Sequence, residues 1–275
     1  MNNIPRSTSK GPLNMRGLLC LWLILLPSSV LANTAWQHPL EDLAIPQVGP
    51  KPAFKEMVDV AKKKAAFFGY LTPQVHAANE RIVRDRAQLL LLEDSLIAGN
   101  LPTPAQAQLV NKLSRRYKLN AEGTSISLER LQALLARVDI LPISLVLAQA
   151  ANESGWGTSR FAMDANNYFG MWCYQKGCGL RPLHRDAGRN HEVKAFDTVF
   201  ENIEAYLLNI NTHRAYLPLR DLRQTLRDLD APLRGVLLAE GLVAYSSRGE
   251  AYVSDIQQLI TANDLEQLQI ELVSN

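Results

Sequence analysis

An apolar run that ends in a carboxylate and two glycines constrains this chain most. Residues 141–150 read LPISLVLAQA, and residues 151–157 continue as ANESGWG. The run predicts a buried helix that Gly155 or Gly157 closes in the left-handed conformation. Glu153 then lies at the edge of an apolar helix, where a charge is costly unless it has a task. A buried carboxyl tends to keep its proton, and a protonated glutamate suits the acid that breaks a glycosidic bond.

The first 32 residues have the pattern of a secretory signal peptide. Three basic residues precede a ten-residue apolar stretch at 17–26, and small residues lead to a cleavage site near Ala32. An uncleaved anchor is the alternative, although the apolar stretch is short for a membrane span. We therefore expect an exported, periplasmic protein without stable membrane insertion after cleavage.

Export changes the charge balance of the chain. Residues 1–32 carry three basic and no acidic residues, so their removal takes the formal net charge from +2 to −1. A near-neutral mature chain lacks the strong basic balance that nucleic-acid binding requires. We expect no nucleic-acid partner.

Two of the three cysteines remain after export. Cys173 and Cys178 are separated by four residues, and in an oxidising compartment this spacing predicts a local disulfide. A zinc site is the alternative, and it would need two more ligands, for which only His184 and His191 are near.

The N-terminal half reads as a linker followed by helices. Residues 33–53 contain four prolines and predict an extended linker. Apolar residues at helical spacing then indicate an N-terminal helical region over 54–125. Within it, Pro73 is expected to end a first helix, a second covers about 75–97, and a third begins at the Thr-Pro pair 103–104.

The remaining chain predicts one domain over 126–265 and a tail over 266–275. Ser127 is a predicted N-cap, and Thr198 begins a capping box. Residues 191–196 alternate as a strand does, so a small β hairpin is expected between the helices. The other helices are expected at about 128–135, 199–211, 217–229, 232–240 and 249–262. The fold class is thus mainly α with a small inserted β lobe, and the cleft beside that lobe would have Glu153 at its floor.

Aromatic and amide residues near Glu153 are candidate glycan contacts. Trp156 and Trp172 offer flat faces to sugar rings, and the amide of Asn167 can hold hydroxyl or acetamido groups. Phe169 and Tyr252 are further candidates, and a core position is the alternative for Phe169. The alternative for Glu153 is a residue at the end of a helix that forms an ion pair with Arg160 or another basic residue.

These motifs resemble the glucosaminidase domain of glycoside hydrolase family 73. The resemblance rests on Glu153-Ser-Gly-Trp-Gly, on Asn167-Tyr-Phe-Gly and on Tyr245-Ser-Ser with Tyr252, and it covers residues 126–265. It implies a lysozyme-like fold and cleavage of the β-1,4 bond after N-acetylglucosamine in peptidoglycan. It also implies that Glu153 is the general acid, with Tyr245 close to it. The family's Asp and Pro after this tyrosine are absent here, and the second tyrosine lies one position further on.

Hydrolysis also needs a base, a nucleophile or the acetamido group of the substrate. Glu192, Asp186 and Asp164 are candidate second carboxylates, and Glu192 on the predicted strand could face Glu153 across the cleft. A solvated strand residue paired with Lys194 or Arg189 is the alternative for Glu192.

The sequence therefore predicts an exported endo-β-N-acetylglucosaminidase that binds peptidoglycan glycan strands and uses neither metal nor cofactor. Cleavage of an amide in the glycan is not expected. A muramidase or lytic transglycosylase on the same fold is one alternative. A non-catalytic glycan-binding protein, with the helices of 54–118 as its working surface, is another.

Overall fold

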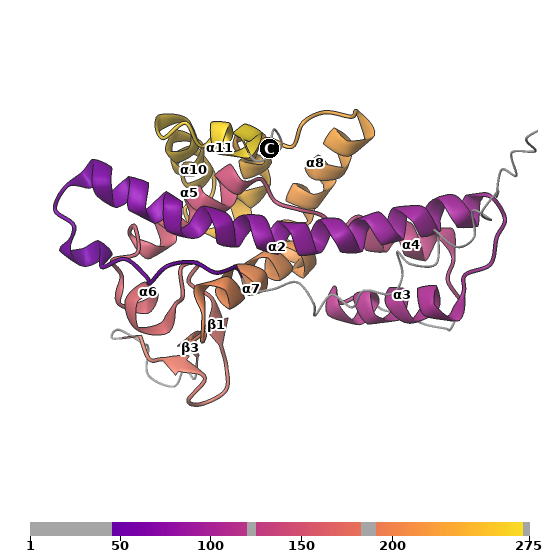
Figure 1. Ribbon diagram of the computed structural model, residues 1–275, viewed down its shortest axis with the longest axis horizontal. Coiled ribbons are helices and arrows are strands. Elements are labelled where there is room, and N and C mark those ends of the chain that lie inside the picture. The colour runs from indigo at the N-terminus through magenta and orange to yellow at the C-terminus, as the bar shows by residue number, and fades with distance from the viewer. Residues whose placement is uncertain (1–45, 120–124, 183–190, 272–275) are drawn as a thin grey trace, which may run out of the picture. The chain divides into compact units, whose positions relative to one another are not determined.

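A computed structural model describes residues 46–119, 125–182 and 191–271. Within these ranges the chain is mostly helical with one small antiparallel sheet, which confirms the predicted fold class (Figure 1). The signal peptide and the first part of the linker lie outside the described residues. So do the possible ligand His184 and the possible second carboxylate Asp186.

The first long element shows that one prediction was wrong. Residues 46–53 have no regular structure and lead to the short 3-10 helix η2 (Phe54–Glu56). Helix α2 (Val60–Ile97) then runs for 38 residues with Pro73 inside it. Proline removes one backbone hydrogen bond and crowds the preceding turn. The helix continues because buried residues on both sides of Pro73, including Leu71 and Val75, hold it against the rest of the protein.

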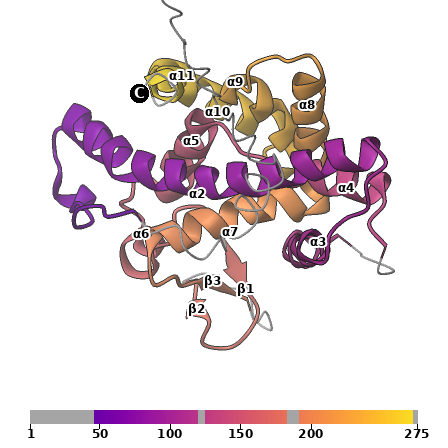
Figure 2. The same cartoon turned by 45° about the vertical axis from the view of Figure 1, so that its right-hand side comes forward.

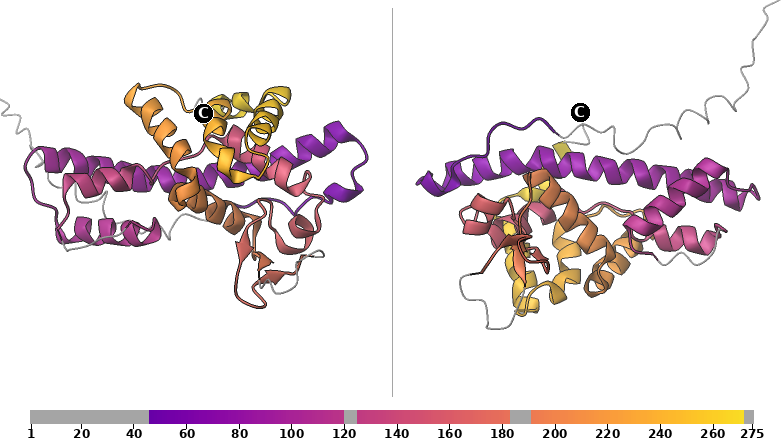
Figure 3. Two further views of the ribbon diagram at one scale, coloured as in Figure 1. Left: turned by 180° about the vertical axis from the view of Figure 1, so that it is seen from behind. Right: turned by 90° about the horizontal axis from the view of Figure 1, so that it is seen from below.

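Helix α2 packs along the helices that follow it in the chain. It contacts α4 (Leu128–Leu135), α5 (Ile143–Ser154) and α7 (Val199–Thr212), which Figure 3 shows from behind and from below. The N-terminal helical region is therefore part of the same packed unit as the predicted domain.

Side-chain caps fix several helix starts where the sequence predicts them. Thr103 and Gln106 form a complete capping box at α3 (Pro104–Arg116), with Pro104 in the first turn. The Ser127 side chain accepts from Arg130 N at the start of α4. The Thr198 side chain likewise accepts from Glu201 N at the start of α7. Each cap satisfies a backbone N–H that the first helical turn leaves unpaired.

The β lobe is a three-stranded sheet rather than a single hairpin. Its strands are β1 (Trp172–Cys173), β2 (Gly179–Leu180) and β3 (Glu192–Lys194), and β3 pairs antiparallel with both others (Figure 2). Helix α6 (Arg160–Ala165), which the sequence analysis did not predict, contacts β2.

The C-terminal part is helical to the end of the described residues. Helices α9 and α11 both contact α5, and α11 crosses the boundary placed between domain and tail. The elements after α7 are η3 (Arg214–Tyr216), α8 (Leu217–Asp228), α9 (Gly235–Leu238), η4 (Ala239–Tyr245), α10 (Glu250–Ala262) and α11 (Leu265–Glu271). None of the helices in the described ranges is long and apolar enough to span a bilayer.

A buried carboxylate fixes the chain just before α5. Asp139 is 2% exposed and accepts two hydrogen bonds from Arg227, of 3.1 and 2.8 Å. Arg86 and Arg223 lie 3.6 and 3.7 Å from the same carboxylate. Burial acts to raise the pKa of Asp139, but the three guanidinium groups outweigh it and the pKa is lowered. Asp139 thereby ties α2 and α8 to the start of α5.

Candidate active site

Glu153 lies in the last turn of α5, as the sequence predicts. Nine residues between Ile143 and Ala151 are buried on this helix, whereas Glu153 is partly exposed. Gly155 ends the helix with a left-handed φ of 56°. The hydroxyl of Ser154 donates to Ala150 O and accepts from Gly157 N at 2.8 Å, so the loop after Glu153 is anchored to its own helix.

Gly157 shows why this loop needs a glycine. Its φ is 74°, and a Cβ atom added there would overlap the ring of Phe54 in η2. Phe54 is 2% exposed. The N-terminal segment thus packs directly on the loop that follows Glu153, through contact that only a residue without a side chain allows.

Trp156 points towards α2. Its ring centroid lies 5.5 Å from that of Phe67 and 5.4 Å from that of Phe68, both edge-on. The ammonium nitrogen of Lys64 lies 5.0 Å from the Trp156 centroid on a ring face. The proposed stacking of a sugar on Trp156 remains a prediction, and the described contacts join this ring to α2.

Four tyrosines from four elements surround the Glu153 carboxylate. They are Tyr206 on α7, Tyr216 on η3, Tyr245 on η4 and Tyr252 on α10. Burial is the main cause that raises the pKa of each hydroxyl, and the negative charge of Glu153 raises each pKa further. The Tyr252 hydroxyl faces the Glu153 carboxylate, and this neighbour raises its pKa further. The four hydroxyls therefore stay protonated around the carboxylate at neutral pH.

Gln149 connects two of these tyrosines. It lies one turn before Glu153 on α5 and is completely buried. The Tyr206 hydroxyl donates to Gln149 Oε1, and Gln149 Nε2 donates to the Tyr252 hydroxyl at 2.9 Å. Because the Tyr252 oxygen accepts from Gln149, its own proton is free to be donated to Glu153. Two hydrogen bonds thus connect Tyr206 through Gln149 to Tyr252, whose hydroxyl faces the carboxylate.

Tyr245 joins the tyrosine cluster to the loop before the sheet. Its hydroxyl donates to Phe169 O at 3.0 Å, and its ring stacks on Tyr252 with centroids 5.2 Å apart and planes 8° apart. Phe169 is 3% exposed and stacks on Tyr206 at 4.0 Å. The structure places Phe169 in the core behind the cluster, and its proposed contact with substrate remains a prediction.

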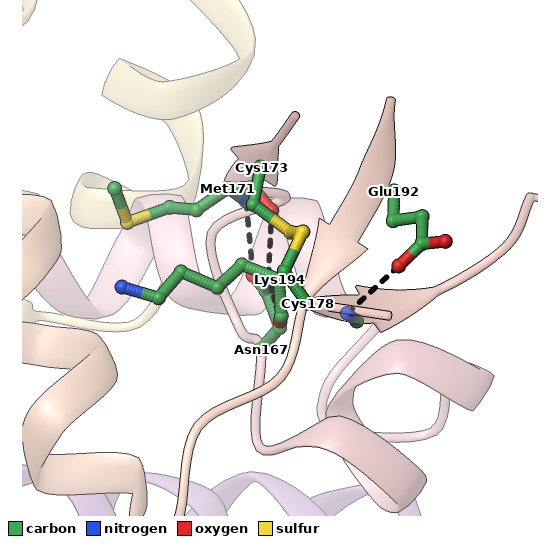
Figure 4. The surroundings of a disulfide bond; sticks show 7 residues. Asn167, Met171, Cys173, Cys178, Glu192 and Lys194 are labelled. Atoms are coloured by element: carbon green, nitrogen blue, oxygen red, sulfur yellow. Dashed lines mark hydrogen bonds between the residues drawn. A yellow bond between two sulfur atoms is a disulfide. The ribbon is translucent and has the colours of Figure 1, made fainter. Parts of the chain in front are cut away.

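Asn167 braces the same loop. It is 2% exposed, and its Nδ2 donates to Met171 O at 2.9 Å and to Lys194 O at 2.8 Å. Its Oδ1 accepts from Met171 N at 3.0 Å. Figure 4 shows Asn167 between Met171 and the end of β3. These bonds use both groups of the amide on the backbone, so a direct contact with a glycan remains a prediction.

Trp172 is the candidate glycan contact with an open face. It is 50% exposed on β1, and its ring lies 4.1 Å, centroid to centroid, from that of His191. Tyr174, two residues on, is 79% exposed. The β lobe thus presents aromatic surface to solvent, as a carbohydrate-binding lobe requires.

The structure places Glu192 inside the β lobe, beside a disulfide. Cys173 and Cys178 form this disulfide with a Cα–Cα distance of 6.2 Å, and Glu192 pairs with Cys173 across the strands. The Glu192 carboxylate accepts from Gly179 N at 3.0 Å (Figure 4). Both sulfur atoms near Glu192 are joined to each other, so this cluster offers no thiolate ligands to a metal.

Sequence reasoning missed Gln149, Tyr206 and Tyr216. A signal existed for Gln149, because it is polar within an apolar run and lies four residues before Glu153, on the same face of the helix. Tyr206 and Tyr216 carry no local signal, since only the packing of α7 and η3 on α5 brings them to Glu153.

Comparison with known proteins agrees with this site. The profile of the Glucosaminidase family, described as mannosyl-glycoprotein endo-beta-N-acetylglucosaminidase, matches residues 128–265. That range carries Glu153 and all four tyrosines. The chain belongs to this family and is therefore a glycoside hydrolase by class.

One relative is similar over most of the chain. Protein bax of Escherichia coli (strain K12) is 32% identical over 219 residues, which cover 77% of this chain and 76% of that protein. No solved structure matches the chain.

Proposed function

We propose that this protein is an exported endo-β-N-acetylglucosaminidase that hydrolyses β-1,4 glycosidic bonds of peptidoglycan, with Glu153 as general acid. The observation that carries the proposal is the Glu153 carboxylate at the end of a buried helix, surrounded by the hydroxyls of four tyrosines. The family match over residues 128–265 supports a glycosidase, and the similarity to Protein bax supports a bacterial one.

In this mechanism Glu153 donates its proton to the oxygen of the leaving sugar. Asn152 and Tyr252 orient the carboxylate, since Asn152 Nδ2 donates to Oε1 at 3.2 Å and the Tyr252 hydroxyl faces the carboxylate. Tyr245 adds an electron-rich ring and hydroxyl near the positive charge that develops on the sugar. Trp172 stacks on the glycan at the β lobe.

The anomeric carbon is attacked in one of two ways. Glu192 acts as base for a water if its carboxylate stands roughly 6.5–9.5 Å from Glu153 with substrate bound, which leaves room for the water and gives inversion. Alternatively, the acetamido oxygen of the substrate displaces the leaving sugar, and water then opens the resulting ring with Glu153 as base, which needs no second carboxylate and gives retention. The anomer released first, followed by NMR, distinguishes the two.

Export is part of the proposal. Residues 1–32 have the signal-peptide pattern with cleavage near Ala32, and a disulfide between Cys173 and Cys178 suits an oxidising compartment. N-terminal sequencing of protein from the periplasm tests this, and a sequence that starts at Met1 would contradict cleavage.

Digestion of purified sacculi tests the reaction. Wild type should release fragments with reducing N-acetylglucosamine ends in mass spectrometry, and Glu153→Gln should be inactive. Glu250→Gln, an exposed glutamate at the start of α10, is the control and should stay active. Reducing muramic acid ends would identify a muramidase, and anhydromuramic ends a lytic transglycosylase. Binding without turnover in the wild type would identify a glycan-binding protein.

A further inference from the structure

A pocket next to Asn152, the neighbour of Glu153, lies between the end of α5, the start of α2 and helix α10. Its volume is about 440 Å³, and it is open to solvent. Its lining includes Lys64, Asn152, Trp156, Asp255, Gln258 and Asn263. The mechanism above uses only Asn152 from this set, so most of the pocket has no function in the proposed bond cleavage.

The pocket carries one positive charge that no described carboxylate balances. Asp255 is paired with Arg248 at 2.6 Å. Within residues 46–119, 125–182 and 191–271, the ion pairs include none with Lys64. A pocket lined by an unpaired ammonium group attracts an anion.

Lys64 is held in place by neutral partners. Its ammonium nitrogen donates to Asn263 Oδ1 at 2.8 Å, while Asn263 Nδ2 donates to Leu259 O at 2.8 Å. The Trp156 ring lies 5.0 Å away on another side. An ammonium group has three N–H donors, so this arrangement fixes the cation and leaves donors for a ligand.

Asn152 connects the pocket to the catalytic carboxylate. Its side chain lines the pocket, and its Nδ2 donates to Glu153 Oε1 at 3.2 Å. The second N–H of this amide and the exposed amide of Gln258 add neutral donors to the Lys64 charge. A ligand in the pocket therefore lies beside the residue that bonds to the Glu153 carboxylate.

We infer that this pocket binds a carboxylate carried by the glycan substrate, with Lys64 as the charged partner and Asn152 and Gln258 as amide donors. The inference rests on the proposed function, which makes the substrate a glycan whose alternate sugars carry lactyl groups and short peptides. The peptides bear carboxylates, and a lactyl group bears one wherever no peptide is joined to it, whereas a polymer of N-acetylglucosamine alone bears none. The pocket thus selects an acidic, branched glycan over a neutral one.

Two variants on one helix test this with two kinds of measurement. Lys64→Met removes the charge and keeps an apolar stem over Trp156, and Lys63→Met, outside the pocket, is the matched control. Each is assayed for kcat/KM on intact sacculi, on peptide-free glycan strands and on sacculi with amidated carboxylates. Co-sedimentation of each protein with the same three materials measures binding apart from turnover.

On intact sacculi, Lys64→Met should have about tenfold lower kcat/KM and about tenfold weaker binding than wild type, as expected for the loss of one charge-assisted contact. The change in kcat/KM should come from a higher KM. Amidation of the sacculi should lower the kcat/KM and the binding of wild type and Lys63→Met by the same factor. It should leave both values unchanged for Lys64→Met. If wild type loses the same factor on peptide-free strands, the pocket binds a peptide carboxylate. If wild type keeps its kcat/KM there and Lys64→Met is again tenfold lower, the lactyl carboxylate, which removal of the peptide exposes, also occupies the pocket.

Binding of Lys64→Met that equals wild type on intact sacculi would overturn the inference. If wild type binds sacculi in a charge-dependent way but does not hydrolyse them, the result supports the inferred pocket and contradicts the proposed reaction.

Discussion

Gln149 Nε2 donates a 2.9 Å hydrogen bond to the hydroxyl of Tyr252, although 103 positions separate the two residues in the chain. The bond matters because it sets the direction of the proton on Tyr252. With its oxygen already accepting, the Tyr252 hydroxyl is left to donate to Glu153. Gln149 acts through this tyrosine and is a positioning residue.

Gln149→Met should lower kcat more than it raises KM. The substitution keeps the volume and leaves the Tyr206 and Tyr252 hydroxyls without their partner, at a cost of about 2 kcal/mol in the free energy of unfolding. Steady-state kinetics on sacculi and urea denaturation measure the two effects. Gln257→Met is the control, since Gln257 bonds to Val236 O at 2.9 Å instead. Gln257→Met should lose stability and keep the kcat of wild type. If Gln149→Met and Gln257→Met have the same kcat, Gln149 does not position Glu153.

Tyr245→Phe should separate the hydroxyl from the ring. It removes the 3.0 Å bond to Phe169 O and keeps the stack on Tyr252. We expect about 1 kcal/mol of lost stability and roughly tenfold lower kcat. Tyr245→Ala should lose more, because the ring is then absent as well. Tyr174→Phe, on a side chain that is 79% exposed, is the control and should behave as wild type. Full activity of Tyr245→Ala would exclude the tyrosine from the mechanism.

Asp85→Asn should change the pH dependence of stability. Asp85 is 2% exposed on α2, and burial raises its pKa to about 7 against the opposing charges of Arg116 and Lys112. The folded state then holds the proton more tightly than the unfolded chain, whose carboxyl has its ordinary value of 3.8. Stability therefore falls as the pH rises from about 4 to about 7, by at most roughly 4 kcal/mol, and stays level above that.

Urea denaturation at pH 4, 6 and 8 measures this effect. Asp85→Asn should match wild type at pH 4 and be the more stable protein at pH 8. Asp94→Asn, at an exposed position on the same helix, keeps Asp85 and should therefore keep the pH dependence of wild type. A difference between Asp85→Asn and wild type that is the same at all three pH values would contradict the raised pKa.

The double variant Cys173→Ser, Cys178→Ser should weaken the β lobe. The disulfide closes a short loop, for which the loss in stability is about 2 kcal/mol. Trp172 precedes Cys173 on β1, so activity on sacculi should fall while the helical part keeps its circular dichroism. Limited proteolysis should cut first within 173–192. Two free thiols in unreduced wild-type protein would show that the bond is absent in solution.

The sequence was most informative where neighbours in the chain decide the structure. The caps at Ser127 and Thr198 form at the predicted positions, because each needs only a side chain and an N–H three residues later. The Glu201 side chain accepts from Asp197 N, so the reciprocal bond of the box predicted at Thr198 does not form. The apolar run before Glu153 forms the predicted helix and ends at Gly155. Prediction failed at Pro73, where the local preference for a break lost to burial on both sides of the proline.

By itself, then, the sequence determined most of the helices, the presence of a small β lobe and the position of Glu153 at the end of a buried helix. Tertiary structure alone decided what surrounds that carboxylate. Gln149, Tyr206 and Tyr252 meet because α5, α7 and α10 pack together, and Lys64 reaches the pocket because α2 packs on α5. Hydrogen bonds between residues a few positions apart leave a pattern in the sequence, whereas contacts across a hundred positions depend on the packing of whole helices.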